Sequence, residues 1–395
     1  MRANAQSIKC GLAFSLKITS VEVYGRRMEV HFAHLRRGTN THQGKCGFAA
    51  TPKRRAAGQR RSHCLEEAAA HGTLLSMSSH YHFEDDLNLS DLLTPLTRAE
   101  DRIARLDERL RKSAVASGAV ERAFYREAIA RMHLEGELVH LDDLVLLDDG
   151  SLGRRNSAEL SRAFHILLHW RQAASASPAS LLRAPRPGEG AHIQEARQSR
   201  PGLLYDPEWN EAGRLSAWRD ALRSGETLPP CLAAVLVMDA WLLLEPEQRG
   251  QWRAPLLASL VLQARAKTRN FVLPISWGAQ RHKFRWSSRA ELNERLTGLL
   301  AWMEAAAEKM DDEANKLTLA REMMHGLITK RRKHSRLHLL ADLLVAKPVV
   351  SIPMAAKALD VTHEAARLMM KQLGSLPREM TGRSSYRVWG IVQGF

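Results

Sequence analysis

Residues 351–373 read SIPMAAKALDVTHEAARLMMKQL, and this stretch carries the start and stop signals of a short helix. Ser351 is among the residue types that favour the N-cap of a helix, and Pro353 is tolerated in a helix's first turn. Apart from Lys357, the residues that follow as far as Leu359 are small or apolar. These signals predict a helix over 352–359.

A tight turn and another helix are predicted directly after it. Asp360 can adopt the left-handed backbone conformation that usually selects glycine. Thr362 can then cap a helix over 363–373, and the small side chain of Ala356 lets the two helices approach each other closely. The residues expected in their shared core are Val361, Ala366 and Met369. Two short helices joined in this way form the helix-turn-helix motif.

The flanking residues predict a winged form of this motif. Upstream, a Leu-rich run over 337–345 predicts a first helix, which ends at Lys347 and Pro348. Downstream, residues 378–389 read REMTGRSSYRVW, which predicts two short strands around a Gly/Ser turn. We therefore expect a winged helix-turn-helix domain over 334–395.

The helix over 363–373 would lie in the major groove of double-stranded DNA, where it can meet base edges and phosphates. The residues that it would present are Thr362, His363, Glu364, Arg367 and Lys371. The residues of the wing that would contact the backbone or the minor groove are Arg383, Tyr386 and Arg387. Residues 330–395 hold 12 Lys and Arg against 4 Asp and Glu, and such a charge favours binding to phosphates. Winged helices also bind proteins, so a protein partner is the alternative for this domain.

The chain before this domain predicts further helices and few strands. Hydrophobic residues make up 45% and charged residues 26% of the 395 residues, which are ordinary globular values. We expect an N-terminal helical region over 77–174, a linker or long loop over 175–202, and a helical core over 203–333. The core ends in a long helix over 291–333, with Gly326 as the point where a break could fall. The predicted fold class is mainly α.

The first 76 residues differ from the rest of the chain. They hold 13 Lys and Arg against 4 Asp and Glu and show no sustained helical or strand period. We expect residues 1–76 to be a basic, disordered extension, or sequence translated upstream of a start at Met77. A basic arm that grips nucleic acid is the functional alternative. The whole chain has a formal net charge of +15, which favours a polyanionic partner.

The hydropathy and the cysteines predict a cytoplasmic protein without membrane association. The longest apolar run, residues 231–244, contains Asp239 and is too short to span a membrane, so it predicts a buried helix. The first 25 residues lack the continuous apolar core of a signal peptide. The four cysteines match neither a zinc pattern nor a disulfide framework.

Residues 245–256 read EPEQRGQWRAPL and form a second feature with a chemical meaning. They resemble the loop HPFxxGNGRxxR of the Fic family, which consists of helical, nucleotidyl-transferring enzymes. The residues that match are Pro246, Gly250 and Arg253. The resemblance covers residues 119–278 and implies a helical Fic-like domain before the winged helix-turn-helix.

The residues that differ from this loop argue against the family's chemistry. Glu245 stands at the position of the catalytic histidine, where a carboxylate would repel a triphosphate and be a poor base at neutral pH. Gln251 and Trp252 replace the Asn-Gly pair that cradles phosphate, and Leu256 replaces the second arginine. The resemblance therefore implies a catalytically degenerate domain.

A second segment resembles the inhibitory helix of the same family, Ser/Thr-x-x-x-Glu-Gly/Asn. Glu135 and Gly136 match the last two positions, with Arg131 where Ser or Thr is expected. Arg253 could pair with Glu135 as a guanidinium pairs with a carboxylate, and we expect this pair to be a structural salt bridge.

Five further segments resemble a family of uncharacterised, often plasmid-borne bacterial proteins that pair a domain of unknown function with a C-terminal helix-turn-helix. The segments are 96–101 (LTRAED), 104–110 (ARLDERL), 134–146 (LEGELVHLDDLVL), 239–244 (DAWLLL) and 378–383 (REMTGR). This resemblance covers residues 79–395, and it implies a domain layout rather than a reaction.

The common cofactor motifs are missing from the sequence. It contains no GxxxxGK(S/T) phosphate loop, no GxGxxG fingerprint, no HExxH helix and no CxxC pair. His165 and His169 have the spacing of zinc ligands, but no third ligand accompanies them, so no cofactor or metal is expected.

The leading hypothesis is a DNA-binding transcriptional regulator, with a homodimer expected because such motifs bind paired half-sites. One alternative is a nucleotidyl or phosphate transferase that uses the altered loop 245–256. The other is a protein-binding plasmid-maintenance factor of the toxin-antitoxin type.

Overall fold

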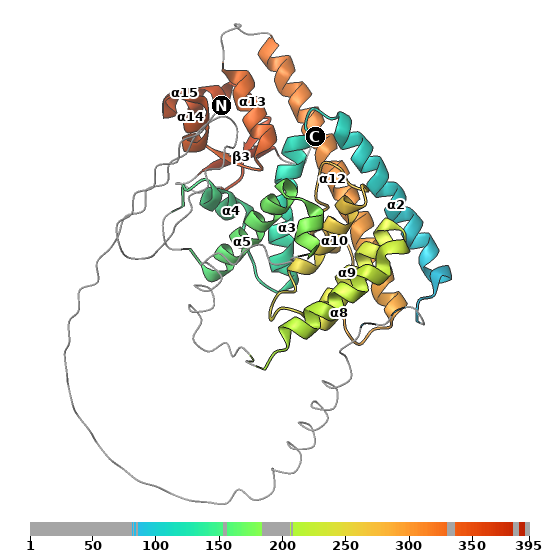
Figure 1. Ribbon diagram of the computed structural model, residues 1–395. Coiled ribbons are helices and arrows are strands. Elements are labelled where there is room, and N and C mark those ends of the chain that lie inside the picture. Colours follow the sequence, from blue (N-terminus) through green and yellow to red (C-terminus); the bar gives the residue numbers. More distant parts are fainter. Residues whose placement is uncertain are drawn as a thin grey trace, which may run out of the picture. The chain divides into compact units, whose positions relative to one another are not determined.

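The computed structural model describes residues 81, 83, 86–152, 156–183, 206, 208–329, 336–381 and 387–391. All of them belong to one unit of the chain, Cys64–Phe395. Helices dominate these residues and strands are few, so the predicted mainly α fold class is confirmed (Figure 1). The extension and the alternative start predicted for residues 1–76 lie outside the described residues.

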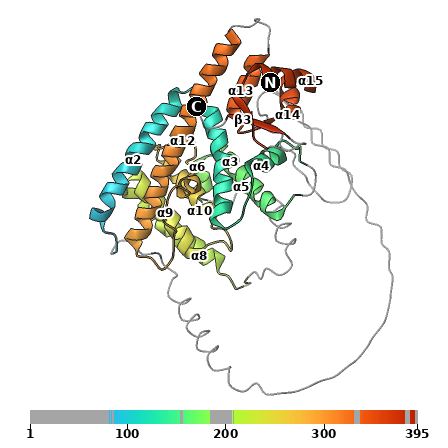
Figure 2. The same ribbon diagram turned by 180° about the vertical axis from the view of Figure 1, so that it is seen from behind.

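The helices before residue 330, which we call the helical body, pack around an apolar core. Their bounds are α2 Leu89–Lys112, α3 Ala116–Leu134, α4 Leu141–Asp148, α5 Ala158–Ser175, α6 Pro178–Arg183, α8 Glu211–Ser224, α9 Pro230–Leu244, α10 Arg253–Ala264, α11 Ile275–Ala279 and α12 Leu292–Thr329, with a 3₁₀ turn at Gly225–Thr227. Figure 1 and Figure 2 both show α2 running beside α12, and α11 and α3 also pack against α12. Helices from before and after residues 184–205 thus share one core. The first part of the segment predicted as a linker or long loop forms α6.

The long helix expected over 291–333 is found as α12, and it continues through Gly326 without a break. Leu317, Ala320 and Met324 are buried on one face and hold this end of the helix against its neighbours. A glycine costs an exposed helix only about 1 kcal/mol relative to alanine. The packing of this face offsets that cost.

The buried helix predicted from the apolar run is α9, and it carries a charge in the core. Asp239 is fully buried. Its carboxylate accepts hydrogen bonds from the Tyr81 hydroxyl at 2.8 Å and from Trp286 Nε1 at 2.6 Å. The Arg295 guanidinium donates to both carboxylate oxygens at 2.9 Å. None of the helices in the described part of the chain has the length and hydropathy to cross a bilayer.

A second buried carboxylate lies between α3 and α11. Glu127 is completely buried, and its Oε2 accepts a hydrogen bond from the backbone N–H of Trp277 at 2.9 Å. Burial raises the pKa of Glu127 to about 7, although hydrogen bonds from Ser276 and Trp277 act in the other direction. The folded protein therefore binds the Glu127 proton more tightly than the unfolded chain does.

The free energy of unfolding of the Glu127→Gln variant is expected to depend less on pH than that of the wild type. A carboxyl whose pKa is raised on folding stabilises the fold below its unfolded pKa, and this stabilisation is lost as the pH rises through the folded pKa. Between pH 4.5 and pH 7, the wild type should therefore lose on the order of 3 kcal/mol of unfolding free energy relative to the variant. Urea denaturation of both proteins across this range measures the difference, and a constant difference would contradict the prediction.

The C-terminal residues form three helices and a small sheet. The helices are α13 Leu337–Ala346, α14 Ile352–Leu359 and α15 His363–Gln372, and the strands are β1 Val350–Ser351, β2 Pro377–Glu379 and β3 Val388–Ile391. The antiparallel sheet has the order β1-β3-β2, with Val350 opposite Trp389 and Arg378 opposite Gly390. The three predicted helices and the two predicted strands are present. Strand β1 was not predicted, because two residues are too few to show an alternating pattern.

Candidate nucleic-acid interface

The turn between α14 and α15 is built by the residues that the sequence indicated. The Ser351 side chain caps α14 by accepting a hydrogen bond from the backbone N–H of Met354 at 3.2 Å. Asp360 follows the helix with φ 51° and ψ 58°, in the left-handed region. Asp tolerates this conformation better than most residues, because its short polar side chain hydrogen-bonds locally. Three residues, 360–362, are therefore enough to connect α14 to α15.

Thr362 then caps α15, and the helix buries one face. The Thr362 hydroxyl accepts a hydrogen bond from the backbone N–H of Ala365 at 3.2 Å. Ala366 and Met370 are buried against α14 and α13, and Leu373 closes the same core. Val361 and Met369, predicted in this core with Ala366, are half-buried and pack against it.

The opposite face of α15 is open to solvent. The predicted recognition residues on this face are Thr362, His363, Glu364, Arg367 and Lys371, and all five are exposed. Arg367 Nη1 lies 3.1 Å from Glu364 Oε2, one turn away on the same helix. This ion pair neutralises the acidic group, so Lys371 and the free edge of the guanidinium are left to attract phosphates.

The predicted wing is only partly described. Arg387 is exposed directly before β3, and its Nε lies 3.4 Å from Glu379 Oε1 on the adjacent strand β2. Arg383 and Tyr386, which we also predicted to contact DNA, lie outside the described residues.

Arg336 is a basic residue at this site that the sequence did not single out. Its guanidinium donates to the carbonyl oxygens of Leu359 and Asp360, at 2.7 Å for Asp360. These carbonyls end α14, where the helix dipole favours a cation. Arg336 is 24 residues from Asp360 along the chain, so no local pattern could reveal this contact.

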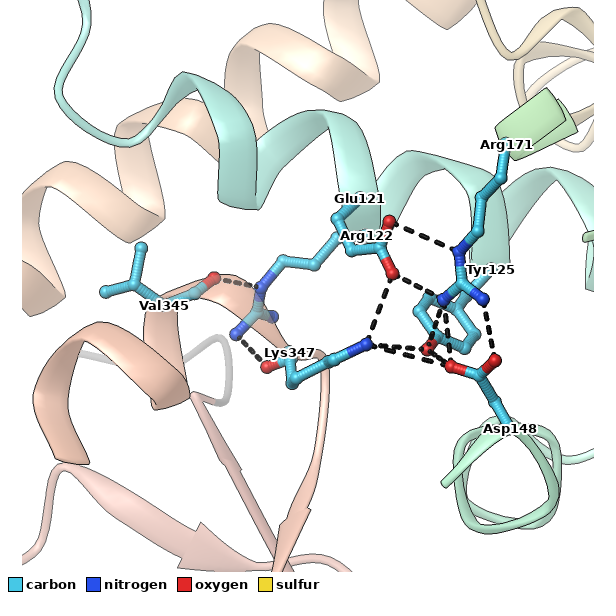
Figure 3. Close-up of polar contacts among 7 residues, drawn as sticks. All are labelled: Glu121, Arg122, Tyr125, Asp148, Arg171, Val345 and Lys347. Atoms are coloured by element: carbon cyan, nitrogen blue, oxygen red, sulfur yellow. Dashed lines mark hydrogen bonds and ion pairs between the residues drawn. The ribbon is translucent and has the colours of Figure 1, made fainter. Parts of the chain in front are cut away.

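The helix-turn-helix is attached to the helical body through the end of α13. Arg122 on α3 is buried, and Figure 3 shows its guanidinium against the C-terminal end of α13. It donates to the carbonyl oxygens of Val345 at 2.9 Å and Lys347 at 2.7 Å, and also to that of Leu344. One turn earlier on α3, a Cβ atom at Gly118 would lie only 2.6 Å from the Val345 oxygen, so this close approach requires a glycine.

The buried charge of Arg122 is balanced by α12. Arg122 Nη1 donates to Glu313 Oε1 at 3.0 Å. Burial acts to raise the pKa of Glu313, but the positive charges of Arg122 and Lys316 outweigh it and hold this pKa below its ordinary value. Helices α3, α12 and α13 thus meet at one buried ion pair.

Lys347 extends this junction to α4 and α5 (Figure 3). Its Nζ lies 3.3 Å from Glu121 Oε1 and 3.7 Å from Asp148 Oδ2. Arg171 on α5 bridges the same two carboxylates, and its Nη1 lies 2.6 Å from Asp148 Oδ1. Tyr125 completes the cluster by donating to Asp148. The residue that follows α13 is therefore held by a network of alternating charges.

The loop that resembles the Fic motif connects α9 to α10. Glu245 ends α9 with φ 44°, and its Oε1 accepts a hydrogen bond from Gln251 Nε2 at 2.7 Å. The carbonyl of buried Gly250 accepts from Trp241 Nε1 at 2.8 Å. Pro246 is also buried. These two hydrogen bonds attach the loop to α9 and connect its first residue to Gln251.

Arg253 and Glu135 each pair with residues other than those expected. Arg253 is 2% exposed, and its Nε lies 2.9 Å from Glu247 Oε2. Glu135 ends α3, where its Oε1 lies 3.0 Å from Arg131 Nε and its other oxygen pairs with Arg162. The predicted salt bridge between Arg253 and Glu135 is wrong, because Arg253 pairs with Glu247, and the two Glu135 oxygens pair with Arg131 on α3 and Arg162 on α5. Gly136 follows Glu135 with φ 80°, a conformation that suits glycine.

A small hollow lies beside this loop, between α5, α6 and α10. Its lining includes His169, Leu181, Trp252 and Leu256. The rings of His169 and Trp252 lie 4.9 Å apart, and burial lowers the pKa of His169 to about 4. In the parts of the chain that the structure describes, His, Cys, Asp and Glu side chains form no group that could hold a metal ion.

Two family models match separate parts of the chain. Residues 203–329 match "Protein of unknown function (DUF1612)", and residues 337–392 match "HTH DNA binding domain". The second match contains the whole of the capped turn and the exposed face of α15. The chain is also 32% identical over 377 residues to the uncharacterized protein y4cF of Sinorhizobium fredii. This alignment covers 78% of the chain and 98% of that relative. The chain therefore carries a domain of unknown function followed by a helix-turn-helix DNA-binding domain, and it belongs to the same family as y4cF.

Proposed function

We propose that the chain binds double-stranded DNA through α15 and acts as a cytoplasmic transcriptional regulator. The observation that carries this proposal is the exposed face of α15, which presents Arg367 and Lys371, with the exposed cap residue Thr362 at the N-terminal end of the helix. A recognition helix contacts base edges with its N-terminal residues and the backbone with its flanks. The exposed Arg336 and Arg387 add positive charge around this face.

A homodimer is part of the same proposal. A single recognition helix reads only a few base pairs, and proteins of this kind gain specificity by placing two helices on half-sites about one helical turn apart. We propose that the helical body brings two copies together. Its firm attachment to α13 through Arg122 supports this role, because the spacing of the two recognition helices must be held.

The double variant Arg367→Ala with Lys371→Ala is expected to bind duplex DNA at least about tenfold more weakly. It should also reduce the slope of log affinity against log salt concentration by nearly two, because two phosphate contacts are lost. Titration of labelled duplexes, first selected from a random pool with the wild type, measures both effects.

The matched control also removes two positive charges, but from α2, which is far from α15 along the chain. Arg98 and Arg105 are both exposed, and Arg105 pairs with Asp101 on its own helix. The Arg98→Ala, Arg105→Ala variant should keep the wild-type salt slope. If both double variants bind like the wild type, α15 is not the recognition helix.

We further propose that the helical body is a Fic-like scaffold without transferase activity. Two features of the loop support this: Arg253 is buried against Glu247, and Glu245 holds Gln251 where the family has a phosphate-cradling pair. An arginine that faces a carboxylate inside the protein is a poor ligand for a triphosphate. Transfer of label from a nucleotide that disappears in Arg253→Ala would overturn this part of the proposal.

A further inference from the structure

Leu368 is an apolar residue in the middle of the exposed face of α15. Its side chain is 57% exposed, whereas Ala366 and Met370 on the other face are buried. Residues three and four apart are neighbours on a helix surface, so Leu368 lies between Glu364 and Lys371. Its exposure places an apolar group at the centre of a polar surface.

The position of Leu368 determines what part of DNA it can meet. The middle of a helix face that enters the major groove lies nearest to the base edges, while long side chains at its borders reach the phosphates. Arg367 and Lys371 are long and charged, and suit the phosphates. Leu368 has no hydrogen-bonding group, so it cannot bind the donors and acceptors of the base edges.

The major groove offers one apolar group in each A·T pair, the 5-methyl group of thymine. We infer that Leu368 contacts a thymine methyl group and selects thymine at one position of the bound site. This inference rests on the proposed function, because it requires α15 to lie in the major groove. The ion pair between Glu364 and Arg367 supports it by keeping the charged groups together beside the leucine.

The thymine contact can be tested with a base that differs from thymine only in the methyl group. A duplex selected from a random pool with the full chain is prepared with each thymine replaced, one at a time, by deoxyuridine. Removing one buried methyl group should weaken binding of the wild type about fourfold at a single position. The Leu368→Ala variant should bind the thymine and deoxyuridine duplexes equally at that position.

The control is another leucine that is exposed on the same domain. Leu339 on α13 is 45% exposed. The Leu339→Ala variant should retain the fourfold preference of the wild type for thymine. This comparison separates a contact with the methyl group from a general effect of removing surface leucines.

Three results would overturn the inference. The first is an equal effect of deoxyuridine on the wild type and on Leu368→Ala at every position. The second is a Leu368→Ala variant that keeps its thymine preference but loses self-association, which would assign this leucine to a contact with a second copy. The third is a wild type that retains no duplex from the pool, and this result alone would also remove the proposed function.

Discussion

Replacing Arg122 by alanine is expected to lower the free energy of unfolding by about 3 to 5 kcal/mol, because it removes the guanidinium that pairs with buried Glu313 and leaves this carboxylate with Lys316 at 3.4 Å. Arg122 is 1% exposed, and burial lowers its pKa to about 10, so it remains charged at neutral pH. The variant also removes the donor from the carbonyls of Leu344, Val345 and Lys347. Urea denaturation followed by circular dichroism measures the loss.

Two variants show whether this loss comes from the junction. Arg105→Ala removes an exposed arginine and its pair with Asp101, and should change stability by less than about 1 kcal/mol. Arg122→Lys keeps a positive charge near Glu313, but an ammonium group cannot reproduce the flat, branched contact with three carbonyls. It should therefore be intermediate. Equal losses for Arg105→Ala and Arg122→Ala would show that the buried contacts of Arg122 do not support the fold.

The helix-turn-helix could be predicted from the sequence because its signals are local. The capping hydrogen bonds of Ser351 and Thr362 each reach only three residues along the chain. Asp360 determines the turn through its own backbone conformation. Such features depend on residue type and spacing alone, so the structure has the predicted helix over 352–359 and a helix that begins at residue 363 as expected.

The attachment of this domain could not be predicted in the same way. Arg122 and Lys347 are 225 residues apart, and the contact between them involves a backbone carbonyl that any residue type supplies. The partner chosen for Arg253 was wrong for a related reason. Glu135 pairs with Arg131, four residues before it on α3, and with Arg162 on α5, and only the pairing with Arg162 depends on the packing of α3 against its neighbours.

Asp239 has one feature that the sequence could predict and one that it could not. Its place within an apolar run predicted a buried helix, and α9 is that helix. Its partners lie 158, 47 and 56 residues away, so the sequence could not show how the charge is balanced. A buried aspartate is tolerated here because each of its two carboxylate oxygens accepts two hydrogen bonds.

Replacing Asp239 by alanine is expected to lower the free energy of unfolding by about 3 to 5 kcal/mol. The Arg295 guanidinium would remain in a place where its side chain is only 9% exposed, without a counter-charge. The Tyr81 hydroxyl and the Trp286 N–H would also lose their acceptor. Chemical denaturation measures the loss, and Asp101→Ala, which removes an exposed aspartate from α2, is the matched control.

A double variant separates the cost of leaving Arg295 buried without a counter-charge from the loss of its attraction to Asp239. Replacing a buried ion pair by apolar residues of similar size is often neutral or stabilising, whereas removal of one partner is costly. Asp239→Leu combined with Arg295→Met should therefore recover most of the stability that Asp239→Ala loses. If instead the double variant is as unstable as the sum of its single variants, the cost does not come from an unpaired charge. The hydrogen bonds of Tyr81 and Trp286 to Asp239 would then be the interactions that α9 requires.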